Sequence, residues 1–294
     1  MIIVITGPTA VGKTKLSIEI AKKMNGEIIN ADSTQVYKGL DIATAKITEE
    51  EKENIPHHLF NIKEITENYT AYDYQKDCRK IINDLLSRGK IPILVGGTGL
   101  YIKAVLYDYQ FNDEKNEQLY EELSTEEIYH KVIQIDKNNT IHKNNRKRLI
   151  RALNYYESTH QPYSSKMKTE KIIYDTLFIG LTTDREKLYE RINQRVDVMV
   201  DSGLLEEAEM IFKSSIRTKA VLTPIGYKEL FPYFENKESL ESCLLKIKQN
   251  SRKYAKRQYT WFNNQMKVQW FHVNFDDFSQ TVEEVYQYIK SSKI

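Results

Sequence analysis

The chain has 294 residues, of which 40% are hydrophobic and 29% are charged, and its formal net charge is +2. This length allows one sizeable core with a smaller domain attached. The sequence contains no run of about 18 apolar residues that could cross a bilayer, and no leader of the secretory type precedes its first apolar run. Cys78 and Cys243 lie far apart and in no metal-ligand spacing, which argues against a zinc site or a disulfide framework. We therefore expect a cytoplasmic protein that does not bind membranes.

The first predicted strand, residues 2–5, leads directly into a glycine-rich loop and then into a predicted helix. In such a loop, glycines let several backbone N–H groups point at one anion, and the positive N-terminal end of the helix adds to the attraction. The lysine reaches the terminal phosphates and the last hydroxyl holds Mg²⁺. The loop matches the phosphate-binding pattern G-x-x-x-x-G-K-[ST], here Gly7, Pro8, Thr9, Ala10, Val11, Gly12, Lys13 and Thr14. This pattern predicts a phosphorylated ligand, with Thr14 as a metal ligand.

Further strand-like runs occur at residues 27–31, 91–95, 176–181 and 268–273, and helical patterns such as 72–86 separate them. This alternation is typical of a doubly wound parallel sheet. Residues 112–140 are polar and poor in strand-forming residues, whereas residues 195–256 have a helical pattern with a break at 223–226. We predict an α/β fold, with a P-loop NTPase-like parallel sheet, helices on both of its faces and an added, mainly helical subdomain.

Ligands of an open α/β sheet bind beyond the carboxyl ends of its strands, and three segments of this chain are predicted to meet there. They are the phosphate loop, the segment Asp32, Ser33, Thr34 and Gln35, and the segment Gly96, Gly97, Thr98 and Gly99. Asp32 has two interpretations: it caps a turn after its strand, or it acts as a general base near the reacting groups. The neighbouring Gln35 favours the second interpretation, because a glutamine amide can pair with an adenine edge.

The third predicted strand ends in Gly-Gly-Thr, where phosphate-loop ATPases commonly carry an acidic residue that helps to hold Mg²⁺. The chain also has no D-x-x-G or N-K-x-D sequence of the GTPase type. The loop is therefore predicted to hold a pyrophosphate that leaves, rather than a γ-phosphate that is transferred.

Two basic clusters are predicted to lie on helix surfaces. One contains Arg146, Lys147, Arg148 and Arg151, and the other contains Arg252, Lys253, Lys256 and Arg257 with aromatic residues between them. Each cluster, taken alone, is compatible with an ordinary solvated helix surface. The two together, with nearby aromatic residues, favour a nucleic-acid backbone and stacked bases as the partner.

These motifs together resemble the tRNA dimethylallyltransferases, and the resemblance extends over nearly the whole chain. The matching segments are GPTAVGKT (7–14), DSTQVY (32–37), TAK (44–46), PHHL (56–59), IPILVGGTGLY (91–101), RLIRAL (148–153), RINQRVDVM (191–199), GL (203–204), GYKE (226–229) and RKYAKRQYTWF (252–262). The phosphate loop alone is common to many families, whereas this combination is specific.

The resemblance implies transfer of a dimethylallyl group from dimethylallyl diphosphate to the N6 amine of the adenine 3′ of the anticodon, in tRNAs that read codons beginning with U. It implies a diphosphate site at residues 7–14 with Mg²⁺, and catalytic roles for Lys13, Asp32, Thr98 and Arg195. Asp32 would take the proton of the amine, and Arg195 would stabilise the pyrophosphate. The residues predicted to bind the tRNA anticodon stem-loop are Asp32, Ser33, Thr34, Gln35, Lys147, Arg148, Arg151, Gly226, Tyr227, Lys228, Arg252, Lys256 and Arg257.

We divide the chain approximately into a P-loop core (1–111), a helical insertion (112–140), a core and tRNA-contacting segment (141–195), a helical segment (196–256) and a C-terminal return to the core (257–294). The chain departs from the family at Thr223-Pro224-Ile225, where Gln-Ala-Ile is frequent. The resemblance implies a bacterial-type enzyme without the zinc-finger extension of some eukaryotic relatives, and we expect a monomer.

Two other interpretations stay open. An adenylate isopentenyltransferase would share the loop and Asp32 but would use a free nucleotide, and the two basic clusters argue against it. A nucleotide-dependent kinase or RNA-binding ATPase is disfavoured by the Gly-Gly-Thr strand end.

Overall fold

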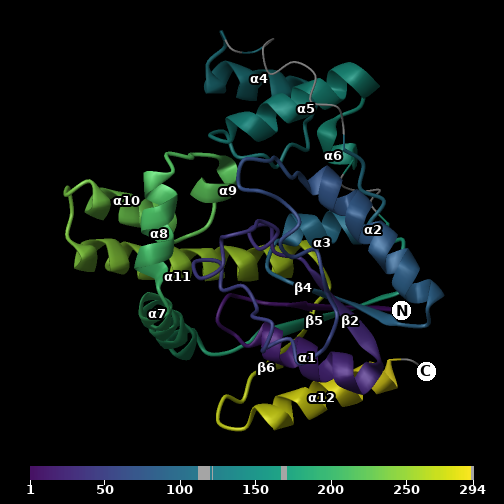
Figure 1. Cartoon of the computed structure of the whole chain (residues 1–294). Coiled ribbons are helices and arrows are strands. Elements are labelled where there is room, and N and C mark those ends of the chain that lie inside the picture. Colours follow the sequence, from purple (N-terminus) through teal and green to yellow (C-terminus); the bar gives the residue numbers. More distant parts are fainter. Residues whose placement is uncertain (112–119, 121, 167–170, 293–294) are drawn as a thin grey trace. The chain divides into compact units, whose positions relative to one another are not determined.

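The computed structural model describes residues 1–111, 120, 122–166 and 171–292 (Figure 1). The chain folds into two compact units, the first comprising Met1–Val105 with Tyr174–Ile294 and the second Leu106–Ile173. The five predicted segments divide the chain more finely and stay a prediction. Residues 112–119 and 121 of the predicted insertion and residues 293–294 of the predicted C-terminal segment lie outside the described residues. In the part of the chain that is described, no helix is long and apolar enough to cross a membrane.

A six-stranded sheet forms the centre of the first unit. Its order is β3-β2-β4-β1-β5-β6, and every neighbouring pair is parallel. The strands are β1 (Ile2–Thr6), β2 (Gly26–Asn30), β3 (His57–His58), β4 (Ile91–Val95), β5 (Thr176–Thr182) and β6 (Gln269–His272). The five strands predicted from the sequence are present. The two-residue β3 was not predicted, because so short a run carries no periodicity.

Helices cover both faces of this sheet, as the sequence predicts (Figure 1). Alternate side chains of one strand point to opposite faces. Ile3 and Ile5 belong to a core cluster shared with α1, α7 and α12, whereas Ile2 and Val4 point the other way and are equally buried. On that second face, α2 is joined to α3, since Gln75 and Arg79 donate hydrogen bonds to the carbonyls of Ala104 and Val105.

The helices associated with this unit are α1 (Lys13–Met24), α2 (Ala71–Ser87), α3 (Gly99–Leu106), α7 (Arg185–Asp201), α8 (Leu204–Lys213), α9 (Lys219–Leu222), α10 (Tyr227–Phe234), α11 (Leu240–Gln265) and α12 (Phe278–Ser291). The predicted helix 72–86 corresponds to α2, whose start is fixed by a capping box between Thr70 and Asp73. The predicted break at 223–226 lies between α9 and α10, where Gly226 adopts a φ of 137°.

The second unit is helical where it is described. Its helices are α4 (Thr125–Ile135), α5 (Arg146–Thr159) and α6 (Tyr163–Lys166). Leu149, Ile150 and Leu153 of α5 pack with Ile128 and Val132 of α4 in a small core. Their spacing leaves the opposite side of α5 to its basic residues.

Candidate active site

The carboxyl ends of β1, β4 and β2 lie side by side, because these strands are neighbours in the parallel sheet. Backbone hydrogen bonds join the loops that follow them: Gly96 donates to Ile5 (N···O 3.3 Å), and Thr98 donates to Ala31 (3.1 Å). The phosphate loop, the segment after β2 and the Gly-Gly-Thr segment therefore meet at one edge of the sheet, as the sequence predicts.

The phosphate loop leads into the N-terminus of α1. Gly12 is the residue before this helix and has a φ of 98°, a left-handed conformation that favours glycine. A Cβ at this position would also lie 2.8 Å from the ring of Phe278. The first N–H groups of a helix have no partner within it, so this end is suited to bind an anion.

Lys13 is held across the loop by its own backbone. The Nζ donates to the carbonyls of Gly7 (3.0 Å) and Pro8 (2.7 Å). An ammonium has three N–H donors, so one remains to bind a phosphate oxygen. The side chain is therefore in position before any ligand binds.

The charges around Lys13 set its protonation. Burial and, after it, the charge of the nearby Arg195 of α7 lower the pKa of its ammonium from 10.5 to about 7, and the charge of Asp32 opposes both. Burial likewise lowers the pKa of the Arg195 guanidinium, and Asp32 again opposes the shift. Lys13, Asp32 and Arg195, three of the four predicted catalytic residues, thus lie close enough to affect one another's charge. Two cations near one carboxylate form a site that favours an added anion.

Asp32 both shapes a turn and faces these cations. Its Oδ1 accepts hydrogen bonds from the Thr34 backbone N–H (2.9 Å) and from the Thr34 hydroxyl (2.7 Å). Its Oδ2 is not part of this turn. Capping and catalysis are therefore compatible, because each interpretation uses a different oxygen of the carboxylate.

Thr98, the fourth predicted catalytic residue, is attached to the same segment. Its Oγ1 accepts a hydrogen bond from the Ser33 backbone N–H (3.0 Å) and lies 3.3 Å from the Ser33 hydroxyl. The Gly-Gly-Thr segment thereby fixes the backbone next to Asp32.

The amide of Gln35 bonds the protein itself. Its Nε2 donates to the carbonyls of Thr44 (2.9 Å) and Ala45 (3.2 Å). Both N–H donors of the amide are therefore engaged by the protein, and pairing with an adenine edge would require them to be released. In this structure Gln35 positions the segment 44–46 instead.

The GYKE segment is partly buried. The Tyr227 side chain is fully buried, and its hydroxyl donates to Glu207 (2.7 Å), which also accepts from the backbone N–H groups of residues 41–43. Gly226 is buried as well, whereas Lys228 is exposed. The Tyr227 side chain is thus engaged inside the protein, and the predicted contact of Tyr227 with tRNA stays a prediction.

The basic residues of α11 do not form one uniform surface. Lys256 and Arg257 are exposed, but Arg252 is half-buried and donates to Asn193 of α7 (2.6 Å). Arg257 lies over the ring of Tyr254, 5.6 Å from its centroid. The exposed part of the cluster therefore begins at Lys253, one residue later than the sequence pattern indicates.

On α5 of the second unit, the predicted surface is present. Lys147, Arg148 and Arg151 are exposed, whereas Arg146 is half-buried and donates to the carbonyls of Leu123 and Tyr120 (2.6 Å each). Arg146 therefore stabilises the unit, and the other three residues are exposed at its surface.

Comparison with known proteins identifies the family. The family model described as IPP transferase matches residues 35–265. The chain belongs to this family. It is 51% identical to the tRNA dimethylallyltransferase of Anoxybacillus flavithermus, over 98% of this chain and 96% of that one. It also resembles the crystal structure of the tRNA isopentenylpyrophosphate transferase from Staphylococcus epidermidis, with 44% identity, a TM-score of 0.75 and 99% of each chain covered.

A structure titled as a eukaryotic dimethylallyltransferase acting on tRNA is similar too, at 33% identity and a TM-score of 0.81, over 92% of this chain and 73% of that one. The family predicted from the motifs is thus confirmed, and with it the P-loop NTPase-like fold and a transferase activity that prenylates tRNA. The individual roles predicted for the site residues stay predictions.

Sequence analysis missed several residues of this IPP transferase that lie around the loop. Arg191 of α7 donates to the carbonyl of Ala10 (3.1 Å) while its guanidinium lies 3.9 Å from the ring centroid of Phe275. Tyr254 lies near Asp32, and burial followed by this charge raises the pKa of its hydroxyl. Gln258 of α11 contacts the loop directly. The RKYAKRQYTWF motif contains two of these residues, but its basic residues gave the stronger signal.

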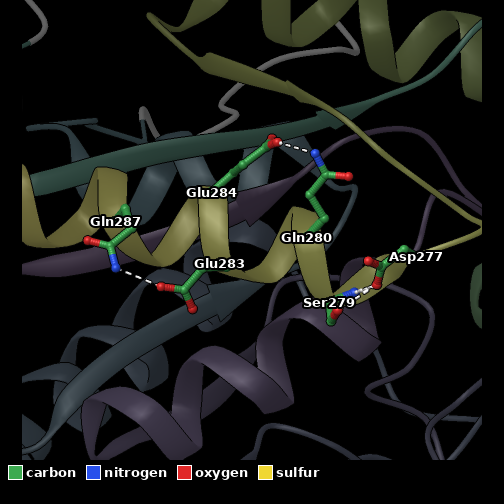
Figure 2. A pocket seen from close by; sticks show the side chains of 6 residues that line it. All are labelled: Asp277, Ser279, Gln280, Glu283, Glu284 and Gln287. Atoms are coloured by element: carbon green, nitrogen blue, oxygen red, sulfur yellow. Dashed lines mark hydrogen bonds between the residues drawn. The ribbon is translucent and has the colours of Figure 1, made fainter.

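A shallow hollow on α12 has the wrong charge for a diphosphate. Its lining side chains are exposed and bond one another: Gln280 donates to Glu284 (3.2 Å) and Gln287 to Glu283 (2.6 Å), one turn apart (Figure 2). Carboxylates repel an anion, so the phosphate loop remains the candidate site.

Proposed function

We propose that this protein transfers the dimethylallyl group of dimethylallyl diphosphate to the N6 amine of the adenine 3′ of the tRNA anticodon, in tRNAs that read codons beginning with U. The new bond joins N6 to C1 of the allyl group, the C1–O bond breaks, and diphosphate leaves with the bonding electrons. The observation that carries the proposal is the meeting of Lys13, Arg195 and Asp32 beside the phosphate loop. A site of two cations and one carboxylate has the groups this transfer needs.

The cations act on the leaving group. An allylic diphosphate ionises readily once its negative charge is neutralised, so charge stabilisation by Lys13, Arg195 and the N-terminus of α1 supplies the main catalytic effect. The carbonyls of Gly7 and Pro8 already hold the Lys13 ammonium, and its third N–H remains for a phosphate oxygen. This preorganisation means that little reorganisation accompanies bond breaking.

The residues present fit a magnesium ion. The Thr14 side chain is exposed at the first turn of α1, and the described residues contain no cluster of three His, Cys, Asp or Glu side chains. Mg²⁺ commonly takes few protein ligands and is held largely by phosphate oxygens and water, so a single hydroxyl beside a diphosphate suffices. When bound there, the ion would neutralise charge on the diphosphate, with Thr14 as its ligand from the protein.

Asp32 acts on the acceptor. We assign Oδ2 to accept the proton of the adenine amine, while Oδ1 keeps its turn with Thr34. Thr98 holds the neighbouring Ser33 backbone, which fixes the direction of the carboxylate. The adenine must leave its stack to reach this site, and extrusion costs a few kcal/mol that contacts with the RNA offset.

Each unit offers basic side chains for those contacts. Lys147, Arg148 and Arg151 lie on the surface of α5, and Lys256 and Arg257 on that of α11. Such residues bind a phosphodiester backbone without reading its sequence. An enzyme for a free nucleotide would need neither surface. We further assign the protein to the cytoplasm, acting as a monomer.

The test uses labelled dimethylallyl diphosphate with an anticodon stem-loop or with AMP as the acceptor. We expect product on the stem-loop. Turnover should be nearly abolished in the Lys13→Ala variant. It should be kept in the control variant Lys15→Ala, because the side chain of Lys15 lies over Phe278. Efficient prenylation of AMP with none of the stem-loop would favour the adenylate enzyme. Strong tRNA-stimulated ATP hydrolysis would favour the ATPase.

A further inference from the structure

One donor of the phosphate loop is already occupied by another part of the protein. The backbone N–H of Thr9 donates to Oε1 of Gln258, with an N···O distance of 3.0 Å. Gln258 comes from α11, 249 residues later in the chain, and only 5% of its surface is exposed. A buried side chain from a distant part of the sequence thus reaches the loop.

The orientation of this amide is fixed by its two partners. Its Nε2 donates to the carbonyl of Gly97 (3.3 Å), whereas Oε1 accepts from Thr9. Thr9 N–H can only donate and a carbonyl can only accept, so exchanging the oxygen and nitrogen would break both bonds. A Cβ at Gly97 would lie 1.8 Å from Nε2, so the glycine gives the amide the room it needs.

The consequence concerns the length of the phosphate chain that the loop can hold. Two phosphates can be held by the N-terminus of α1 together with Lys13, neither of which involves Thr9. A longer chain needs further donors, and Thr9 N–H belongs to the part of the loop that precedes the helix. There Gln258 removes a donor and presents an acceptor oxygen, which carries a partial negative charge and disfavours a third phosphate.

We infer that Gln258 is a specificity-determining residue, which makes this phosphate loop select a diphosphate over a triphosphate. The inference rests on the proposed placement of the diphosphate at the loop. It explains how a loop pattern shared with ATP-binding proteins can serve an allylic diphosphate in a cell rich in nucleoside triphosphates. Gln258 bonds the loop, so it acts through the donor that it occupies.

The experiment measures binding of inorganic pyrophosphate and of inorganic tripolyphosphate by calorimetry, with and without Mg²⁺. Gln258→Met keeps the shape of the side chain and frees Thr9 N–H. We expect the ratio of tripolyphosphate to pyrophosphate affinity to rise about tenfold or more, as for one added hydrogen bond to a charged group. Gln258→Glu places a carboxylate at the loop, and the same ratio should fall. Gln249→Met, an exposed glutamine of the same helix, should leave the ratio unchanged.

If Gln258 had a merely structural role, each variant would lose affinity for pyrophosphate and for tripolyphosphate by the same factor. That result would overturn the inference. An unchanged ratio would overturn it as well. If Gln258→Met fails to fold, the Gln258→Glu variant tests the opposite shift. Pyrophosphate binding that does not depend on Lys13 would overturn the placement of the diphosphate together with this inference, whereas Lys13-dependent binding with an unchanged ratio overturns this inference alone.

Discussion

The lowered pKa of Lys13 predicts that diphosphate binding weakens as pH rises through neutrality. Burial and the nearby Arg195 bring the pKa of the ammonium to about 7 in the protein without ligand. Above this pH the side chain is mostly neutral, but a diphosphate at the loop favours the charged form. Binding must then take up a proton, so the apparent affinity should fall about tenfold at pH 8 and about a hundredfold at pH 9 relative to its low-pH limit.

Folding stability should change in the opposite direction. Unfolding returns Lys13 to its ordinary pKa of 10.5, so between about pH 7 and 10.5 the unfolded state binds more protons. The contribution of Lys13 therefore makes the protein without ligand more stable as pH rises through this window. The stabilisation added by pyrophosphate should decrease over the same range.

Calorimetry in buffers of different ionisation enthalpy measures both the affinity and the protons taken up. At pH 8 the wild type should take up close to one proton more than Lys13→Arg, because a guanidinium stays charged throughout. Because residue 13 of the Lys13→Arg variant stays charged, the pH dependence of its binding gives the contribution of the ligand's own ionisation. Identical pH profiles for the two proteins would refute the reasoning, since the profile would then belong to the ligand alone.

Three further predictions concern the acceptor side, the RNA surface and the GYKE segment. Asp32→Asn keeps an oxygen for the turn but no base, so single-turnover transfer should slow by roughly 10²–10⁴-fold; a nearly normal rate would make Asp32 only a turn residue. Lys256→Gln should reduce the slope of log tRNA affinity against log salt by about one. Lys246→Gln should not, because this exposed lysine of the same helix is already paired with Glu238. Tyr227→Phe should cost about 1–3 kcal/mol in urea unfolding, because it removes a buried bond to Glu207; weaker tRNA binding with unchanged stability would contradict this.

The sequence predicted the sheet and the loop because both leave strong local signals. Five strands carry runs of apolar residues, and the phosphate loop needs particular residue types at fixed spacing. The order of the strands then brings the loop, Asp32 and Thr98 to one edge. The predictions of the strands and of the loop depend on runs of apolar residues and on one sequence motif, and both are local properties of the sequence.

The sequence did not show where a side chain is used by a distant part of the fold. Gln35 and Tyr227 have groups that suit RNA, yet their polar atoms bond the protein itself. Arg252 belongs to a basic cluster in sequence but turns to α7 in the structure. Sequence spacing shows which residues share a helix face, but not which of them another helix covers.

Gln258 was missed for the same reason, because the sequence does not show which distant segment its side chain contacts. Its neighbours in the motif are basic and aromatic, which drew attention to the surface of α11, while the buried side of that helix reaches the phosphate loop. The exposed side carries Lys256 and Arg257, one or two residues away. One helix therefore presents cations to solvent and an amide to the diphosphate site.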